Sequence, residues 1–290
     1  MADTYKRFRS PIQYVGGKYW LVEHIWDFLP EGLTEMMSPF FGAGTVEINI
    51  AYHKGVKVYA YDICEFVMNF WKHWMQSPSQ IIRDAKRLCM ESNQEDLRKL
   101  KKRVIKDGKI RDPYGMAVYF YVFNRLSFQG ITHCDFIDKY RNEDGTLYKS
   151  EKSKVFLYDD WEYAKNIHLE IKACEFQKSL TEHTDVFAYL DPPFFSTEQV
   201  FGKGKQIFNH HELSEILKSR DNWILSSGHY PQVPYIKLAY KGYTMLEYSR
   251  TSGFHYNTGA KTEWTQLLIF SHDLAEKAIR KRQENGVNKD

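Results

Sequence analysis

Apolar and polar positions follow two different patterns in the first part of the chain. Residues 17–29 carry apolar side chains at helical spacing, and residues 33–55 combine a short apolar strand, a glycine-containing turn and a helix. The run VKVYAYDI is rich in β-formers and stops at Asp62, and EFVMNFWKHWMQ after it has helical spacing. Strand, helix and strand in this order predict a parallel α/β sheet.

The same rhythm returns in the second half of the chain. DVFAYL predicts a buried strand, HHELSEILKSR predicts a helix with Asn209 as its N-cap, and NWILSSG predicts another strand. YTMLEYSR and TEWTQLLIFSH predict two more strands, followed by a charged helical tail. We therefore predict a sheet domain of residues 1–64 and 166–290, interrupted by a helical insertion of residues 65–165.

Composition places the chain among ordinary globular proteins, with 43% hydrophobic and 27% charged residues among 290. The net charge of +3 does not by itself indicate a nucleic-acid partner. Basic residues concentrate between positions 79 and 109, where a solvated helix face and a nucleic-acid contact surface are equally good interpretations. Four cysteines without CxxC spacing favour reduced thiols over a metal site. No apolar run is long enough to cross a membrane, and the N-terminus lacks the apolar centre of a secretion signal.

A glycine turn and a later acid suggest a nucleoside pocket. Gly42-Ala43-Gly44 lies between the first strand and its helix, where glycine allows positive φ and close approach of a ligand. Asp62 ends the next strand, the position at which an acid binds ribose hydroxyls in Rossmann-like folds. Glu47 occupies the third-glycine position of a dinucleotide fingerprint, which makes a nucleotide-dependent oxidoreductase a distant alternative. The other alternative is a tight turn with an unrelated surface acid.

A second motif, Asp191-Pro192-Pro193-Phe194, directly follows an apolar strand. Proline fixes its own φ and holds the preceding residue in extended geometry, so this exit from the strand is stiff. The turn would hold a carboxylate, backbone carbonyls and an aromatic ring in one fixed arrangement, which suits the binding of a flat polar ring. The alternative is a strand followed by a plain proline turn.

Six segments in this order resemble the D12-class (Dam-like) DNA adenine-N6 methyltransferases: YVGGK, PFFGAGT, YDI, NRLSFQG, DPPF and TEWTQLLIF. The resemblance extends from about Ile12 to Phe270 and matches the family's α arrangement. It implies a Rossmann-like seven-stranded sheet that uses S-adenosylmethionine (SAM), with a helical DNA-recognition insertion. It also implies double-stranded DNA as the partner and a bacterial or phage-infected cytoplasm. The chain would be a monomer or homodimer, any restriction endonuclease would be a separate chain, and no metal is implied.

The resemblance also assigns a cofactor site. Tyr14 and Lys18 would line the methionine end of SAM, Asp62 would bind the ribose, and Ile63 and Phe176 would border the adenine. The implied cofactor residues are Tyr14, Gly17, Lys18, Phe41, Gly42, Ala43, Gly44, Thr45, Asp62, Ile63, Phe176 and Asp191.

For the reaction, the resemblance implies a target adenine flipped out of the duplex. Asp191 and the Pro192 carbonyl would accept hydrogen bonds from its amine, and Phe194 would stack on the base. The implied catalytic residues are Asp191, Pro192, Pro193 and Phe194. The candidate DNA contacts are Asn124, Arg125, Lys99, Lys101, Lys102, Lys203 and Lys205, for which a surface loop, a solvated face and a buried arginine partner are the alternatives.

Three positions depart from the family pattern. Ser38 replaces the usual acid before the glycine motif, Phe194 replaces a tyrosine, and residues 131–154 do not follow the recognition hairpin of GATC-specific members. The target sequence therefore does not carry over. Methylation of cytosine-N4 or of RNA adenine, and an inactive DNA-binding relative, remain alternatives.

Overall fold

The computed structural model describes residues 6–14, 16–127, 161–193, 208–227, 233–252 and 262–286. The chain divides into two compact units. Unit 1 comprises Met1–Val22, Gly42–Gly55 and Cys64–Ala173, and unit 2 comprises Glu23–Phe41, Val56–Ile63 and Cys174–Asp290. The main chain passes from unit 2 to unit 1 between Phe41 and Gly42, in the middle of the glycine motif.

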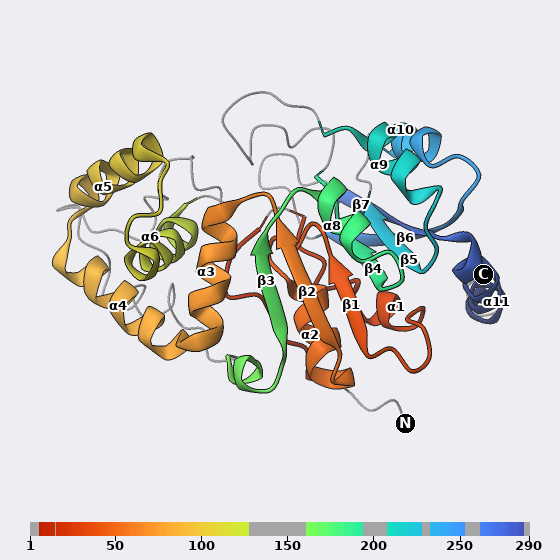
Figure 1. The fold of residues 1–290 in the computed structure, drawn as a ribbon, viewed down its shortest axis with the longest axis horizontal. Coiled ribbons are helices and arrows are strands. Elements are labelled where there is room, and N and C mark those ends of the chain that lie inside the picture. The colour runs from red at the N-terminus through yellow and green to blue at the C-terminus, as the bar shows by residue number, and fades with distance from the viewer. Residues whose placement is uncertain are drawn as a thin grey trace. The chain divides into compact units, whose positions relative to one another are not determined.

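Seven strands form one sheet in the described part of the chain, in the order β3-β2-β1-β4-β5-β7-β6 (Figure 1). They are β1 Glu35–Ser38, β2 Lys57–Asp62, β3 Leu169–Ala173, β4 Phe187–Leu190, β5 Trp223–Ser227, β6 Thr244–Ser252 and β7 Thr262–Phe270. β1 pairs in parallel with β2 and β4, β4 pairs in parallel with β5, and β7 runs antiparallel to both β5 and β6. The sheet confirms the predicted Rossmann-like seven-stranded architecture.

The strand order creates a switch point beside β1. From β1 the chain continues to β2 on one side, and β4 later takes the place on the other side. In open α/β sheets, ligands bind outside the carboxyl ends of the strands at such a point. The parallel strands β1 and β4 are short and almost entirely buried, as expected for strands covered on both faces.

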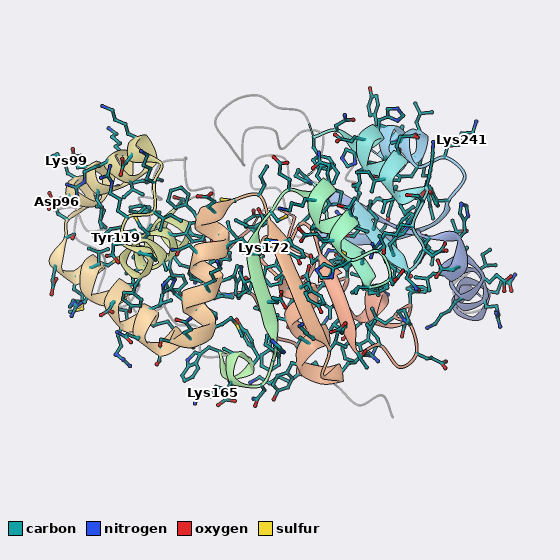
Figure 2. The ribbon with its side chains drawn as sticks, in the orientation of Figure 1. Asp96, Lys99, Tyr119, Lys165, Lys172 and Lys241 are labelled. Carbon is teal, nitrogen blue, oxygen red and sulfur yellow. The ribbon has the colours of Figure 1, made fainter. Side chains whose placement is uncertain are left out.

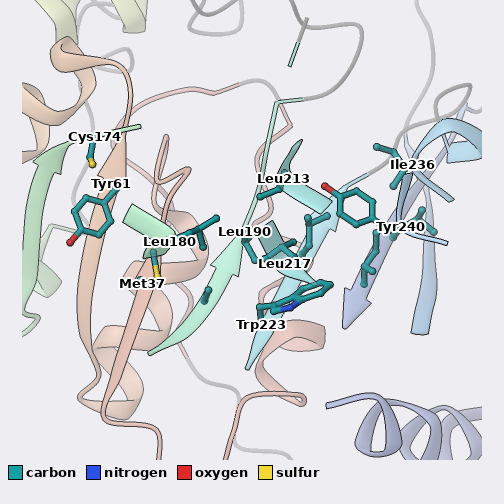
Figure 3. Packing of buried hydrophobic residues seen from close by; sticks show 14 residues of the cluster. Met37, Tyr61, Cys174, Leu180, Leu190, Leu213, Leu217, Trp223, Ile236 and Tyr240 are labelled. Atoms are coloured by element: carbon teal, nitrogen blue, oxygen red, sulfur yellow. The ribbon is translucent and has the colours of Figure 1, made fainter. Parts of the chain in front are cut away.

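The core of unit 2 fills the space between these strands and the neighbouring helices. Leu190 of β4 and Trp223 of β5 pack with Leu213 and Leu217 of α9 and with Tyr240 (Figure 3). Its later helices are α8 Phe176–Glu182, α9 His210–Leu217, α10 Val233–Ala239 and α11 His272–Gly286. Asn209 caps α9 as predicted, since its side chain accepts a hydrogen bond from the Glu212 amide at 3.1 Å. The helices α8 and α10 were not predicted.

Unit 1 is mainly helical. Its helices are α2 Thr45–Lys54, α3 Glu65–Gln76, α4 Pro78–Glu91, α5 Gln94–Asp107 and α6 Pro113–Leu126, with a 3-10 turn, η3, at Glu162–Lys165. α6 packs against α3 and α4 and is buried along most of its length. Trp74 of α3 donates its indole N–H to the Tyr163 hydroxyl of η3 at 3.0 Å. These helices confirm the helical character predicted for residues 79–109.

The first predicted helix is much shorter than its apolar pattern suggested. The spacing extends over residues 17–29, but α1 spans only Val22–Trp26. Three-residue turns flank it, because the Leu21 amide bonds to Lys18 and the Phe28 amide bonds to Ile25. The apolar side chains in these turns are still buried. The apolar pattern therefore predicted which residues are buried, but the helix length predicted from it was wrong.

Candidate functional site

The carboxyl ends of four parallel strands bring polar and aromatic residues of unit 2 to one edge of the sheet. Phe41 follows β1, Asp62 ends β2, Asp191 follows β4, and Ser226 lies near the end of β5. These residues are far apart in the sequence. Parallel pairing brings them together, because parallel strands end on the same side.

Asp62 and Ile63 form a contrasting pair at the end of β2. Asp62 is only 9% exposed, and its backbone carbonyl accepts a hydrogen bond from the Cys174 amide at 3.0 Å. Ile63 is 67% exposed, although it is a large apolar side chain. A largely buried acid next to an exposed apolar surface provides one group for hydroxyls and another for a flat ring.

Three phenylalanines gather beside this edge. The ring centroids of Phe40 and Phe176 are 5.5 Å apart, and Phe208 lies 5.4 Å from each. All three are partly buried and pack against the core of unit 2. Phe176 was predicted to border the cofactor, and the structure places it in this aromatic cluster at the start of α8.

In unit 1 the glycine turn closes against Tyr14. Gly42 has φ 44° and Gly44 has φ 61°, both in the left-handed region. A Cβ added to Gly42 would lie 2.9 Å from Cε1 of Tyr14, so only glycine fits against this ring. Gly44 is the N-cap of α2, and Trp71 donates to the Gly42 carbonyl at 2.9 Å. The structure thus brings Tyr14 and the glycine motif together.

Lys18 belongs to the same region of unit 1 but is enclosed. The side chain is 3% exposed, and its ammonium donates to the Gly16 carbonyl at 2.8 Å. The Gly17 amide donates to the Tyr14 carbonyl at 3.3 Å. These bonds join Gly17 to Tyr14 and Lys18 to Gly16, and Val15 lies outside the described residues.

The Asp191-Pro192-Pro193 turn is fixed by hydrogen bonds within unit 2. Ser226 donates from Oγ to Oδ1 of Asp191 at 3.2 Å, and Oγ of Ser226 lies 2.8 Å from the Tyr189 hydroxyl. Nε2 of His210 lies 3.1 Å from the Pro193 carbonyl oxygen. The remaining candidates of this region, Phe194, Lys203 and Lys205, lie outside the described residues.

His210 is neutral around pH 7. Burial lowers its pKa from 6.5 to about 4, although the bond to the Pro193 carbonyl opposes that shift. A neutral imidazole carries one proton, and a carbonyl oxygen only accepts, so this proton lies on Nε2. Nδ1 is then the acceptor toward the Tyr240 hydroxyl, 3.3 Å away.

Two of the predicted DNA contacts are internal. Asn124 is fully buried, and its amide bonds to both the N–H and the carbonyl of Gln13 at 2.8 Å. Lys101 is 7% exposed and donates to Ser127 Oγ at 3.0 Å. Each side chain makes an internal bond that helps to hold α5 or α6 in place, and DNA binding by either residue stays a prediction.

The other candidates of the helical segment are accessible. Lys99 and Lys102 are exposed on α5, and Lys99 points outward from the helix in Figure 2. Lys99 forms a 3.9 Å ion pair with Glu95, one turn earlier and also exposed. Arg125, at the end of α6, is partly buried. For these three residues, DNA binding stays a prediction.

Three residues of this site were missed in the sequence. Ser226 had a weak signal, because NWILSSG places hydroxyls where an apolar strand ends. His210 was interpreted only as a helix start, and nothing local marks its bond to Pro193. Phe208 gave no signal apart from its aromatic ring.

Within the described residues, no group of His, Cys, Asp and Glu side chains is arranged to hold a metal ion. No helix in the described part of the chain is both long and apolar enough to cross a membrane. Among the described residues, Cys174 is a buried free thiol.

The order of the seven strands is that of a Rossmann-like methyltransferase. Residues 14–253 match the family described as D12 class N6 adenine-specific DNA methyltransferase. The chain belongs to this family. Its reaction is methyl transfer to the N6 amine of adenine in DNA.

Relatives agree with this assignment along most of the chain. A DNA adenine methylase from Vibrio cholerae is 25% identical, over 94% of this chain and 100% of the relative. A DNA adenine methylase from Haemophilus influenzae is 25% identical, over 67% of this chain and 66% of its own. The type II methyltransferase M1.LlaDCHI from Lactococcus lactis is 26% identical, over 63% of this chain and 64% of the relative.

The contact between Gly42 and Tyr14 predicts different costs for two alanine substitutions. Gly32→Ala should cost about 1–2 kcal/mol, because its φ of 67° is positive but nothing lies within 4 Å of the added Cβ. Gly42→Ala should cost about 1–3 kcal/mol more, because the Cβ also meets the Tyr14 ring. Urea unfolding of both variants measures the difference. Equal costs would show that Tyr14 does not lie against the turn.

The lowered pKa of His210 predicts a pH-dependent stability. The unfolded chain takes up a proton near pH 6.5 and the folded chain only near pH 4, so stability is lost as the pH falls through this window. The loss should approach about 3 kcal/mol. His210→Gln should remove this component of the pH dependence in urea unfolding, whereas His211→Gln, at an exposed neighbour, should keep it. The same pH profile in all three proteins would contradict the buried neutral ring.

Proposed function

We propose that SAM binds at the carboxyl ends of β1, β2 and β4, with Asp62 on its ribose hydroxyls. The observation that carries this proposal is the position of Asp62 and Asp191 at the switch point of the sheet. Ile63, exposed beside Asp62, offers an apolar surface for the cofactor's adenine. When bound, SAM supplies an electrophilic methyl group.

The glycine motif directly follows Phe41 in the main chain and supplies further candidate cofactor residues in unit 1. Phe41 is bonded directly to Gly42, and the following turn has no side chain at two positions, Gly42 and Gly44. We assign Gly42, Ala43, Gly44 and Thr45 to the cofactor site on this basis. Tyr14, Gly17 and Lys18 join the assignment because their turn lies against Gly42 within unit 1.

Asp191 and the Pro192 carbonyl would activate the target amine. The lone pair of an aromatic amine is delocalised into the ring, which makes the nitrogen a poor nucleophile. Two acceptors aimed at its N–H groups draw the nitrogen toward tetrahedral geometry and free that lone pair. The nitrogen would then form a bond to the methyl carbon of SAM as the carbon–sulfur bond breaks. The thioether S-adenosylhomocysteine would leave, and the extra N–H proton would pass to solvent. Positioning and fixed electrostatics supply most of this catalysis.

The amine is not accessible inside a base-paired duplex, so the target adenine must leave the helix. We propose duplex DNA as the substrate, held in part by the exposed lysines of α5, Lys99 and Lys102. We also propose that the protein works in the cytoplasm of a bacterium or phage-infected cell. The names of type II relatives support a link to restriction in which the endonuclease is a separate chain.

One experiment separates cofactor binding from chemistry. Tritiated SAM and mixed-sequence duplex DNA, followed by nucleoside digestion, should place label in N6-methyldeoxyadenosine. Asp191→Ala should abolish this label while SAM still binds by calorimetry. Asp62→Ala should weaken SAM binding by about 10–100-fold, the worth of a hydrogen bond to a charged group.

Asp221→Ala is the matched control, since this carboxylate is exposed and precedes β5, away from the carboxyl ends of the strands. Asp221→Ala should change neither the methylation of DNA nor the affinity for SAM. Full activity of Asp191→Ala would reject the catalytic assignment, and unchanged SAM affinity of Asp62→Ala would remove that residue from the pocket.

The exposed lysines of α5 predict a change in the salt dependence of DNA binding. Lys99→Gln combined with Lys102→Gln should lower the slope of log K against log salt by about 1.8, because each phosphate contact contributes about 0.9. Fluorescence anisotropy at several salt concentrations measures that slope. Lys165→Gln with Lys241→Gln removes the same charge at other exposed positions, labelled in Figure 2, and should leave the slope unchanged. Equal slopes for the two double variants would show that these lysines of α5 form a solvated face that does not contact DNA.

A further inference from the structure

Two buried hydrogen-bond chains end on the Asp191-Pro192-Pro193 turn from different sides. We propose that Ser226 and His210 are positioning residues, which hold the Asp191 carboxylate and the Pro193 carbonyl in the geometry that methyl transfer requires. The inference rests on the catalytic role proposed for Asp191. It adds two residues that the sequence did not assign to the reaction.

The register of β4 and β5 creates the first chain. Tyr189 pairs with Ile224, and Leu190 pairs with Leu225. Side chains alternate along a strand, so Tyr189 and the residue two positions later share a face with Ser226 on the neighbouring strand. The register therefore places the Ser226 hydroxyl between Tyr189, at 2.8 Å, and the Asp191 carboxylate, at 3.2 Å.

Proton counting fixes the direction of this chain. A carboxylate only accepts hydrogen bonds, so Ser226 donates its single proton to Asp191. The Tyr189 hydroxyl must then donate to Ser226. Both hydroxyl residues are buried, at 1% exposure for Tyr189 and none for Ser226. The bond between Tyr189 and Ser226 is buried, the bond to Asp191 is part-buried, and each donor strengthens the next.

The second chain begins at Tyr240, which is fully buried in the core of unit 2 (Figure 3). Burial raises the pKa of Tyr240, so its hydroxyl keeps its proton and donates to Nδ1 of His210. Nε2 of His210 donates to the Pro193 carbonyl. Because His210 is the first residue of α9, whose start is capped by Asn209, the donor is itself held in place.

These hydrogen-bond chains restrain rotations in the turn that the proline rings leave free. The pyrrolidine rings fix φ of Pro192 and Pro193, but ψ of each can still rotate. A hydrogen bond to the Pro193 carbonyl restrains ψ of that residue, and the bond from Ser226 restrains the Asp191 side chain. A displacement of about 1 Å in a reacting group costs about a hundredfold in rate, so loss of either anchor should be visible in kcat.

The test of the first chain compares two adjacent serines. Ser226→Ala should lower kcat by about 10–100-fold with little change in the KM for SAM, because the carboxylate remains but loses its restraint. Ser227→Ala is the matched control, since Ser227 is equally buried and its Oγ has no hydrogen-bond partner among the described residues. It should retain wild-type kcat. Ser226→Thr keeps the hydroxyl and should recover part of the rate.

The test of the second chain compares two adjacent histidines. His210→Phe fills the same buried space but carries no hydrogen-bond donor, so it should lower kcat. His210→Gln keeps an amide N–H that can reach the Pro193 carbonyl, so it should retain more of the wild-type kcat than His210→Phe. His211→Ala, at the exposed neighbour on α9, should leave kcat unchanged. Thermal unfolding of every variant distinguishes loss of folding from loss of position.

Each outcome supports or overturns a defined statement. A kcat defect in Ser226→Ala in a folded protein, absent from Ser227→Ala, supports the positioning role. Wild-type kcat in folded Ser226→Ala together with wild-type kcat in folded His210→Phe would overturn it. If Asp191→Ala is inactive in that case, the proposed function survives and only this inference fails. Activity in Asp191→Ala would instead remove the function on which the inference rests.

Discussion

The parallel pairing of β1 with β4 is the constraint on which the site depends. Met36 pairs with Phe187 and Met37 with Ala188, so both strands end on the same side of the sheet. The glycine motif and the Asp-Pro-Pro turn follow these two ends directly. β2 and β5 join in the same direction and add one residue each, Asp62 and Ser226. A different strand order would scatter the same residues.

Rigidity at the Asp-Pro-Pro turn has a local and a tertiary source. The prolines restrict their own backbone, but they also remove two N–H groups with which the turn could otherwise have anchored itself. The anchors must therefore come from other parts of the chain. Ser226 and His210 supply them through donated hydrogen bonds, and Tyr189 and Tyr240 stand behind these two residues in the buried core.

The helical segment of unit 1 combines support with an exposed basic surface. Asn124 bonds both backbone groups of Gln13, the residue before Tyr14, so α6 holds the segment that lies against the glycine turn. Lys101 ties α5 to the end of α6, whereas Lys99 and Lys102 on the same helix remain exposed. A basic helix can therefore stabilise the fold with one lysine and leave its neighbours accessible for a polyanion.

The sequence by itself determined the elements and motifs that depend on neighbouring residues: most strands and helices, the glycine turn, the acid that ends β2 and the stiff exit after β4. Periodicity, proline geometry and the position of glycine are local properties. Only the tertiary structure decided the order of the strands, the bond from Ser226 to Asp191, the neutral His210 and the burial of Asn124 and Lys101. These features join residues far apart in the chain, and a local pattern carries no information about which distant group a polar side chain will meet.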